Sequence, residues 1–156
     1  MEPREYMRQA LELARQAMEE GEVPVGCVIV RDGAVVGRGR NRRETEHTAL
    51  GHAELDAIRQ ACGALGGWRL SRCALYVTLE PCPMCAGAMV MACLDRCYFG
   101  ARDARQGCCE SVYALPGDPA FYHRLPCVGG LMEEEAAALL RRFFQARRST
   151  EEGGTP

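Results

Sequence analysis

Two short segments of the sequence carry side chains that bind metals and transfer protons. They are His52-Ala53-Glu54 and, about thirty positions later, Pro81-Cys82-Pro83-Met84-Cys85. Cys82 and Cys85 are three residues apart at the expected start of a helix, so both sulfur atoms can face one point. Two thiolates and one neutral imidazole make a neutral Zn²⁺ site with three protein ligands, which leaves the fourth position to water. The pattern predicts one catalytic Zn²⁺ per chain at His52, Cys82 and Cys85.

Glu54 would supply the proton transfer that such a site needs. Residues two apart within a helix point to nearly opposite sides, so His52 and Glu54 converge only where a helix begins. A carboxylate beside a metal-activated water can accept its proton, because zinc lowers the pKa of that water to about 7. Glu54 can then return protons to a ring nitrogen and to a leaving amine, so that ammonia departs. The alternative is that Glu54 is an ordinary exposed acid of a helix.

The remaining histidines and cysteines leave further alternatives open. A fourth ligand from His123 or Cys109 would turn the open site into a closed, structural one. The chain has 10 cysteines, but a disulfide scaffold is typical of short secreted chains. Most of the cysteines lie in apolar stretches, where a reduced thiol packs as a small hydrophobic group. The adjacent Cys108 and Cys109 are the pair that could be reactive.

Hydrophobic periodicity predicts the elements that would position these residues. Helical spacing of apolar residues predicts helices over residues 4–20, 52–65 and 133–148. Pro83, followed by small and apolar residues, predicts a helix over 83–94. β-rich runs predict strands over residues 23–30, 34–39, 74–79, 96–100 and 127–132, the first two joined by a hairpin turn. Strands separated by helices favour a sheet that is covered on both faces. We expect one α/β domain over 1–148, a three-layer α/β/α sandwich, and a disordered tail over 149–156.

Composition and charge limit the partner less than the motifs do. The net charge of −2 argues neither for nor against a polyanion, but all 19 basic residues are arginines. Arginine suits bidentate contacts with phosphate, and arginines cluster at 38–43 and 141–148, although a solvated charged face is the commoner reason for such runs. The first nine residues contain no apolar run of a signal peptide, and no run approaches the roughly 20 residues of a membrane helix. We expect a soluble cytoplasmic protein without a membrane partner.

The sequence resembles the bacterial tRNA-specific adenosine deaminases from about Tyr6 to Arg148. His-x-Glu combined with Pro-Cys-x-x-Cys is the signature of zinc nucleobase deaminases, and the two motifs together are far more specific than either alone. The other stretches that carry the resemblance are Gly-Glu-Val-Pro-Val-Gly at 21–26, the strand and helix around the cysteines at 76–89, Tyr-Phe-Gly-Ala-Arg-Asp at 98–103, and Phe143-Phe144.

The resemblance implies zinc-dependent hydrolytic deamination of adenosine to inosine at the wobble position of a tRNA anticodon. It implies a cytidine deaminase-like fold with a central five-stranded mixed sheet, and a homodimer whose site for the anticodon stem-loop uses both chains. Zinc would be held by the three ligands above, with Glu54 as the proton shuttle. Asn41 would hydrogen-bond the substrate, Pro24 and Val25 would wall the base pocket, and Ala53 would place its backbone N–H near the base.

Three departures from the family pattern fall where the chain would contact RNA or a partner chain. Phe121-Tyr122-His123-Arg124 stands where the family usually has Asn-His-Arg, Cys93-Leu94-Asp95 lies where an arginine is usual, and Gly51 replaces an alanine. Candidate RNA contacts are Tyr122, His123, Arg124 and Phe143, although each could serve packing instead. Two alternatives follow. One is a deaminase of a free nucleobase or nucleoside of the guanine, adenine or cytosine type; the other is a noncatalytic, zinc-stabilised partner subunit, which would have no need of Glu54.

Overall fold

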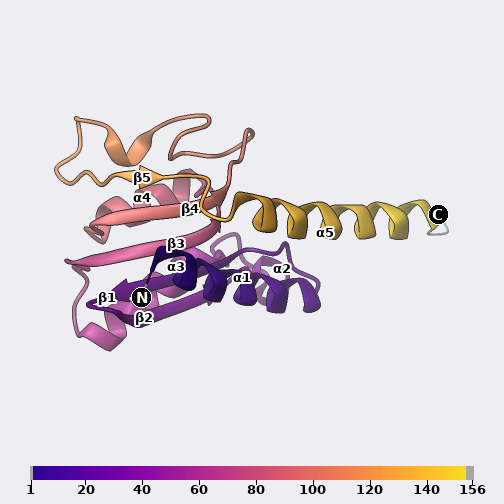
Figure 1. Ribbon diagram of the computed structural model, residues 1–156, viewed down its shortest axis with the longest axis horizontal. Helices are drawn as coiled ribbons and strands as arrows, with labels where there is room; N and C mark the ends of the chain where they lie inside the picture. Colours follow the sequence, from indigo (N-terminus) through magenta and orange to yellow (C-terminus); the bar gives the residue numbers. More distant parts are fainter. Residues whose placement is uncertain (1, 154–156) are drawn as a thin grey trace.

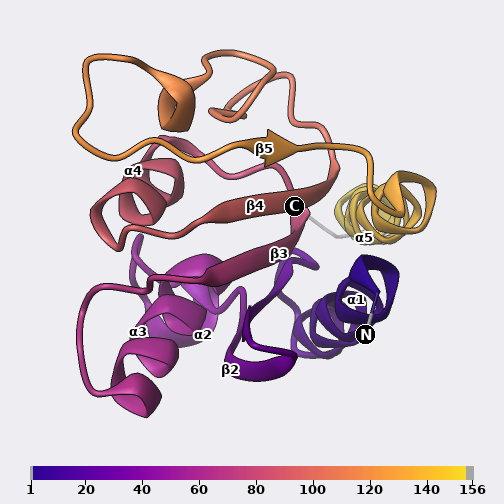
Figure 2. The ribbon, with the colours of Figure 1, turned by 60° about the vertical axis from the view of Figure 1, so that its left-hand side comes forward.

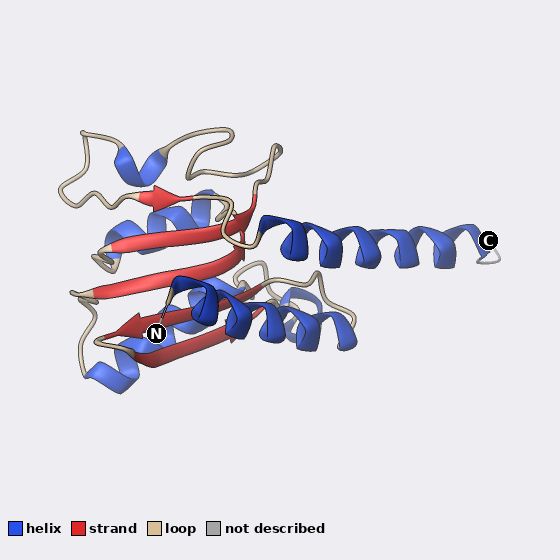
Figure 3. Cartoon of the chain, in the orientation of Figure 1, coloured by secondary structure: helices blue, strands red, loops and turns tan. Residues whose placement is uncertain are grey.

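The computed structural model describes residues 2–153 and has a five-stranded mixed sheet between two layers of helices (Figures 1 and 3). The strands are β1 (Gly26–Arg31), β2 (Ala34–Arg40), β3 (Cys73–Leu79), β4 (Arg96–Ala101) and β5 (Cys127–Val128). Their order across the sheet is β2-β1-β3-β4-β5. β1 is antiparallel to β2 and β3, whereas β3, β4 and β5 run parallel. The predicted three-layer α/β/α sandwich with a mixed sheet is confirmed.

Helices cover both faces of the sheet. They are α1 (Pro3–Glu19), α2 (Arg43–Glu46), α3 (Ala53–Leu65), α4 (Pro83–Met91) and α5 (Glu133–Gly153), with a 3₁₀ turn at Leu115–Gly117. α1 and α5 lie on one face, and α3 and α4 lie on the other (Figure 2). No helix within residues 2–153 is long and apolar enough to cross a membrane.

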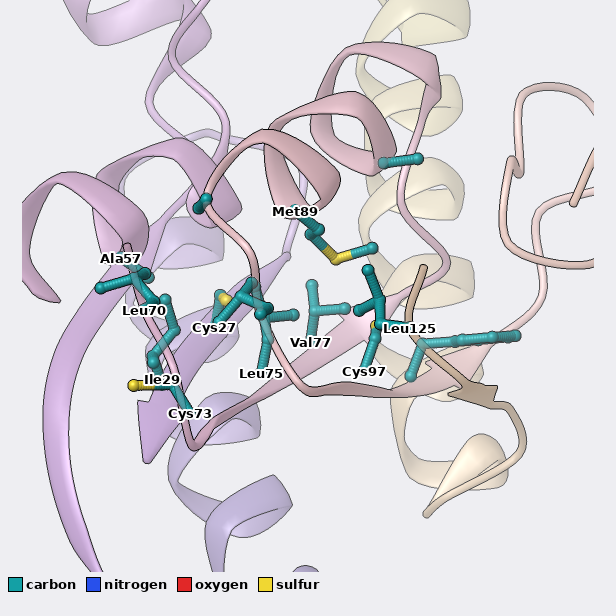
Figure 4. Close-up of a cluster of buried hydrophobic side chains, with 14 of the residues drawn as sticks. Cys27, Ile29, Ala57, Leu70, Cys73, Leu75, Val77, Met89, Cys97 and Leu125 are labelled. Carbon is teal, nitrogen blue, oxygen red and sulfur yellow. The ribbon is translucent and has the colours of Figure 1, made fainter. Parts of the chain in front are cut away.

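The central strands are buried on both faces because successive side chains of a strand point to opposite sides. In β1, Cys27 and Ile29 belong to the core under α3 and α4, whereas Val28 and Val30 belong to the core under α1. Figure 4 shows the first of these cores, in which Ala57 of α3 and Met89 of α4 pack over the strands. The strands therefore read as nearly continuous apolar runs, as the sequence indicated.

Three element boundaries differ from the prediction for local reasons. β1 begins at Gly26 because the Val25 N–H donates to the carbonyl of Val23 at 2.9 Å in a tight turn. α4 ends at Met91 rather than at residue 94, since Cys93 has a φ of 58° in the left-handed region. β5 has only two residues, because two glycines follow it and Gly130 has a φ of 91°.

The prediction of a disordered tail from residue 149 is wrong for residues 149–153, which continue α5. Residues 154–156 lie outside the described part of the chain. The Thr150 hydroxyl donates to the carbonyl of Ala146 at 3.0 Å, one turn earlier in the helix. The residues at 149–153 are Ser-Thr-Glu-Glu-Gly, so they show no hydrophobic period from which a helix could be predicted.

A close approach of β2 to α3 fixes the start of the helix that carries His52 and Glu54. A Cβ atom at Gly39 would lie 2.1 Å from the carbonyl oxygen of Ala53 and 2.8 Å from the backbone nitrogen of Ala57. Real Cβ atoms do not approach backbone atoms so closely, and backbone cannot rotate away as a side chain can. Glycine at this position therefore allows α3 to lie directly on β2.

We predict that Gly39→Ala destabilises the protein by about 1–3 kcal/mol or more, since it overpacks a contact between backbones. The control is Gly63→Ala on the exposed side of α3, where an added Cβ meets nothing within 4 Å. That variant should gain about 0.5–1 kcal/mol from helix propensity. Urea unfolding of both variants measures the difference, and equal stabilities would contradict the close approach.

Candidate metal centre and active-site cleft

Three potential metal ligands meet at the starts of two helices. His52 is the N-cap of α3 and has an extended backbone, and Cys82 is the N-cap of α4. Cys85 follows in the first turn of α4, where Pro83 fills the first position. The Nδ1 atom of His52 lies 3.6 Å from Sγ of Cys82 and 3.4 Å from Sγ of Cys85. The sequence motif is thus assembled into one cluster, with Nδ1 of His52 facing both sulfurs.

These distances fit a tetrahedral zinc ion. Zn–N and Zn–S bonds of about 2.0–2.1 and 2.3 Å put nitrogen and sulfur about 3.6 Å apart. All three ligand atoms lie within 4.8 Å of one another, and within residues 2–153 no fourth histidine, cysteine or acid joins this group. The cluster could therefore hold a metal ion in an open, three-ligand site, and the donor set of one imidazole and two thiols suits zinc.

The surroundings favour ionisation of Cys82. Its contact with the Cys85 thiol, and then with the His52 ring, lowers the pKa of Cys82 to about 4. The N-terminus of α4 adds partial positive charge, which stabilises a thiolate. The two contacts shift the pKa of the partner groups the opposite way: the interaction with Cys82 raises the pKa of both Cys85 and His52.

Glu54 lies next to this cluster and is almost fully buried. Only 4% of it is exposed, so the alternative that it is an ordinary exposed helix acid is wrong. Burial raises the pKa of Glu54 to about 7. Because α3 begins at Ala53, His52 and Glu54 flank the helix start and both line one cleft. A carboxyl group with a pKa near neutrality can both accept and release protons, as a general acid–base requires.

The cleft has a volume of about 840 Å³. The predicted site residues that line it are Val25, Asn41, His52, Ala53, Glu54 and Cys82. Pro24 is buried next to Val25 and is not among the lining residues. The Asn41 amide donates to the carbonyl of Val23 at 3.2 Å and accepts from the Arg43 N–H at 3.3 Å. It keeps one N–H and one oxygen lone pair for a ligand in the cleft.

Arginines surround the cleft, mostly from the C-terminal part of the chain. Those that line it are Arg43, Arg102, Arg105, Arg141, Arg147 and Arg148. In the other cluster noted in the sequence, at 38–43, Arg40 of β2 pairs with Glu20 at the end of α1, and Arg42 pairs with Asp56 of α3. These two arginines therefore join the end of β2 and the residues after it to the neighbouring helices. Arg141, Arg147 and Arg148 of α5 give the cleft a positive edge.

The predicted RNA contacts lie outside this cleft. Tyr122 is fully exposed in the loop that leads to β5, near the start of β4, whereas the cleft loop follows the end of β4. β4 has six residues, so these ends are about 20 Å apart. Arg124 is exposed in the same loop as Tyr122. Phe143 lines a neighbouring groove with Met18, and the Arg147 guanidinium covers its ring at 5.7 Å.

Neither alternative fourth ligand reaches the cluster. The Nε2 atom of His123 lies 2.6 Å from the carbonyl oxygen of Leu94. Cys109 lies instead with Cys97 and Cys127, whose sulfur atoms form a second group. The closed, structural zinc site is therefore not supported.

Two buried carboxylates that hold the walls of the cleft were missed by sequence reasoning. Glu80 accepts hydrogen bonds from the backbone N–H groups of Asp103, Cys109, Glu110 and Ser111 at 2.8–3.2 Å. It thereby fixes the loop after β4 next to the cysteine motif. Burial alone would raise the pKa of Glu80, but the hydrogen bonds from Ser111 and the loop backbone lower it.

Glu22 fixes the other wall in the same way. It is 1% exposed, and it accepts hydrogen bonds from the backbone N–H groups of Glu44 at 3.1 Å and Thr45 at 2.7 Å. These bonds attach α2 to the segment that carries Val23 and Val25. Both acids border apolar strand runs and lie in stretches that carry the family resemblance, but neither signal identifies the N–H groups that they bind.

This fold and this cleft are those of a deaminase with the cytidine deaminase-like architecture. The chain belongs to the MafB19-like deaminase family, which matches residues 1–148. It is 45% identical to the tRNA-specific adenosine deaminase of Bacillus subtilis (strain 168) over 92% of this chain and 89% of that protein. The expected family resemblance is confirmed.

Two solved structures show how far the likeness extends. One comes from biochemical and structural studies of A-to-I editing by tRNA:A34 deaminases at the wobble position of transfer RNA. It has a TM-score of 0.84 and 44% identity over 87% of this chain and 99% of that one. The guanine deaminase from Bacillus subtilis has a TM-score of 0.65 and 31% identity over 96% and 95% of the two chains.

We predict that Glu22→Gln lowers the free energy of unfolding by about 1–3 kcal/mol at neutral pH, since a buried N–H loses its charged acceptor. Although burial alone would raise the pKa of Glu22, its hydrogen bonds with Thr45 and Glu44 lower it in the folded state. The stabilisation is therefore present above the unfolded pKa and is lost as pH falls through the folded pKa. Urea unfolding from pH 7 to pH 3 should show the wild-type advantage shrinking below about pH 4.5.

The control is Glu12→Gln, at an exposed acid of α1, which should change stability by less than about 0.5 kcal/mol over the whole pH range. A loss of stability in Glu22→Gln that does not depend on pH would contradict this account.

Proposed function

We propose that this protein converts adenosine to inosine at the wobble position of a tRNA anticodon, with Zn²⁺ held by His52, Cys82 and Cys85. The observation that carries the proposal is that Glu54 and two residues of the three-ligand cluster, His52 and Cys82, line one cleft that is edged by arginines. Arginines at the edge of a cleft can bind the phosphates of a nucleic acid, whereas a free base carries no negative charge for them to bind. Relatives at 38–45% identity are named tRNA-specific adenosine deaminases, and a tRNA substrate implies a cytoplasmic enzyme.

The residues of the cleft would hold an adenine base that has been flipped out of its stack. The Ala53 N–H belongs to the first turn of α3, where backbone donors have no acceptor inside the helix, so it can donate to the base. Asn41 offers its free N–H and lone pair to the purine edge. Val25 supplies an apolar wall. Together these groups orient the carbon that bears the amine toward Glu54 and the ligand cluster.

Glu54 would move the protons of the reaction. Zn²⁺ held by His52, Cys82 and Cys85 would lower the pKa of a water molecule, whose oxygen would add to the carbon that bears the amine. Glu54 accepts a proton from that water and passes it to the ring nitrogen next to the amine-bearing carbon. It then carries a second proton to the leaving amine, so adenosine and water become inosine and ammonia. Burial suits this role, because the raised pKa of Glu54 lies near the pH of the reaction.

We propose in addition that the protein is a homodimer that meets through α4. The outward face of this helix carries Met84, Gly87, Ala88 and Met91 at helical spacing, and Met91 is 74% exposed. No charged residue lies on α4, and an added Cβ at Gly87 would meet nothing within 4 Å. An uncharged stripe of small and apolar residues favours close approach of a second helix.

The roles of the ligand cluster and Glu54 are tested by two variants. Glu54→Gln should keep its zinc and its fold but lose about 10²–10⁴-fold in turnover, because glutamine cannot shuttle protons. Cys82→Ala should lose both the zinc at this site and the activity. Metal analysis and circular dichroism accompany each rate. If Glu54→Gln kept more than a tenth of the wild-type rate, the proton shuttle would be another group.

The substrate is tested with an anticodon stem-loop that has adenosine at position 34. We expect inosine in this RNA and little ammonia from free adenosine, adenine, guanine or cytosine. A pocket around the base alone gains little binding energy, so the flanking nucleotides must supply the rest. The likeness to a guanine deaminase makes guanine the informative competitor. Efficient release of ammonia from guanine with an unmodified stem-loop would favour the free-base deaminase instead.

The dimer is tested by light scattering and by Tyr122→Ala. The particle should have twice the 17.1 kDa mass of one chain. Because Tyr122 lies about 20 Å from the cleft of its own chain, we propose that it contacts RNA that is bound in the cleft of the second subunit. If its ring stacks on a base, Tyr122→Ala should raise KM for the stem-loop and leave the zinc content unchanged. The loss of binding free energy should be about 1–3 kcal/mol. A 17 kDa particle with full activity would contradict the shared site.

A further inference from the structure

A second cluster of sulfur atoms lies away from the cleft. Cys97 in β4, Cys109 in the loop after β4, and Cys127 in β5 bring their Sγ atoms within 4.8 Å of one another. Cys97 and Cys127 are partners in the register of the two parallel strands. Cys97 and Cys109 are buried, and Cys127 is half-buried at the edge of the sheet. Cys97 lies beside Leu125 in the core under α4 (Figure 4).

This grouping differs from the way the other cysteines pack. Cys62, Cys73 and Cys127 each donate to a nearby backbone carbonyl, at 3.7, 3.6 and 4.0 Å, but of these three only Cys127 belongs to a metal-ligand cluster among the described residues. The backbone N–H of Cys108, the residue before Cys109, donates to the carbonyl of Pro81 at 2.8 Å, and Cys108 lies near Cys82. Successive residues of one loop therefore contribute to the surroundings of two separate clusters.

Three sulfurs at this spacing match the chemistry of a thiophilic metal ion. Zn–S bonds of about 2.3 Å in a tetrahedron put the sulfurs about 3.8 Å apart. The buried Glu80 carboxylate accepts a hydrogen bond from the Cys109 N–H at 3.2 Å, so a negative charge that favours a cation lies next to one of the three cysteines.

The charge of the ion follows from the ligand count. Three thiolates with a monovalent ion would leave two negative charges in a largely buried site, whereas a divalent ion leaves one. Because unpaired buried charge is costly, the divalent ion is preferred. Within residues 2–153 no fourth histidine, cysteine or acid joins the group, so water would complete the tetrahedron on the side of the half-buried Cys127.

The position of the cluster gives such an ion a structural role. The segment between β4 and β5 spans residues 102–126 and contains only a three-residue 3₁₀ turn. β5 itself has two residues, so few ladder hydrogen bonds hold it on the sheet. An ion bound by one cysteine from each of β4, the loop and β5 would attach the loop and the edge strand to the core.

We propose that Cys97, Cys109 and Cys127 bind a second divalent thiophilic ion, zinc being the first candidate, at a site separate from the active-site cluster. The proposal does not depend on the proposed function, because none of these three residues lines the cleft.

Zinc content tests the proposal on the full-length protein, purified with a reductant from cells grown with added zinc. We expect two zinc ions per chain in the wild type and one in Cys127→Ser. Cys62→Ser is the matched control, since Cys62 is also half-buried and donates only to a carbonyl; it should keep two. Cys82→Ala should keep one ion, at the second site, while losing activity, which separates the failure of one site from the failure of the other.

Cobalt(II) substitution and native mass spectrometry provide readouts that do not need a variant to fold. In the wild type, the thiolate charge-transfer absorbance should correspond to five Co–S bonds rather than two, and the mass should include two ions. One zinc per chain in the wild type, with three free thiols at this cluster, would overturn the proposal. So would a mass lower by two hydrogens without a second ion, because it would show a disulfide in place of the metal.

Discussion

The site depends on one constraint: two helices from different crossovers must begin at the same point. β3, α4 and β4 form one parallel crossover, and α3 joins β2 to β3 on the same face of the sheet. Both helices therefore start near the strand ends that border the cleft. A ring nitrogen and two sulfurs can then lie within 3.4–3.6 Å without a long loop to hold them. Each helix start also brings unpaired N–H groups, which favour negative charge on the ligands.

Much of this arrangement could be predicted from the sequence. The period of the apolar residues in 52–65 predicted the first helix, and the proline after Cys82, followed by small and apolar residues, predicted a second helix from residue 83 that ends at Met91 rather than at 94. The chemistry of His52, Cys82 and Cys85 then required a common point. Asn41, in contrast, could be placed in the cleft only through the family resemblance, since an asparagine after a strand is most often a turn residue.

The residues that could not be predicted are those whose role depends on distant partners. Glu22 and Glu80 are separated by more than twenty residues from the N–H groups that they bind, and no periodicity links a buried acid to a remote loop. The same holds for Tyr122, whose distance from the cleft follows from the direction of β4. Likewise, Cys97, Cys109 and Cys127 show no spacing motif, because strand register and a loop bring them together.

The last feature concerns how α5 is held. Its early turns are anchored by Ala136 and Leu139 in the core and by the pair between Arg102 and Glu133 at 2.9 Å. Beyond residue 140 the helix extends past the sheet (Figure 1) with mostly exposed side chains. Amide hydrogen exchange should therefore divide this one helix in two: the inner turns open with the whole domain, and the outer turns open locally at little cost in free energy. Three of the arginines that edge the cleft, Arg141, Arg147 and Arg148, thus belong to a segment whose order can increase when a polyanion binds, at the expense of conformational entropy.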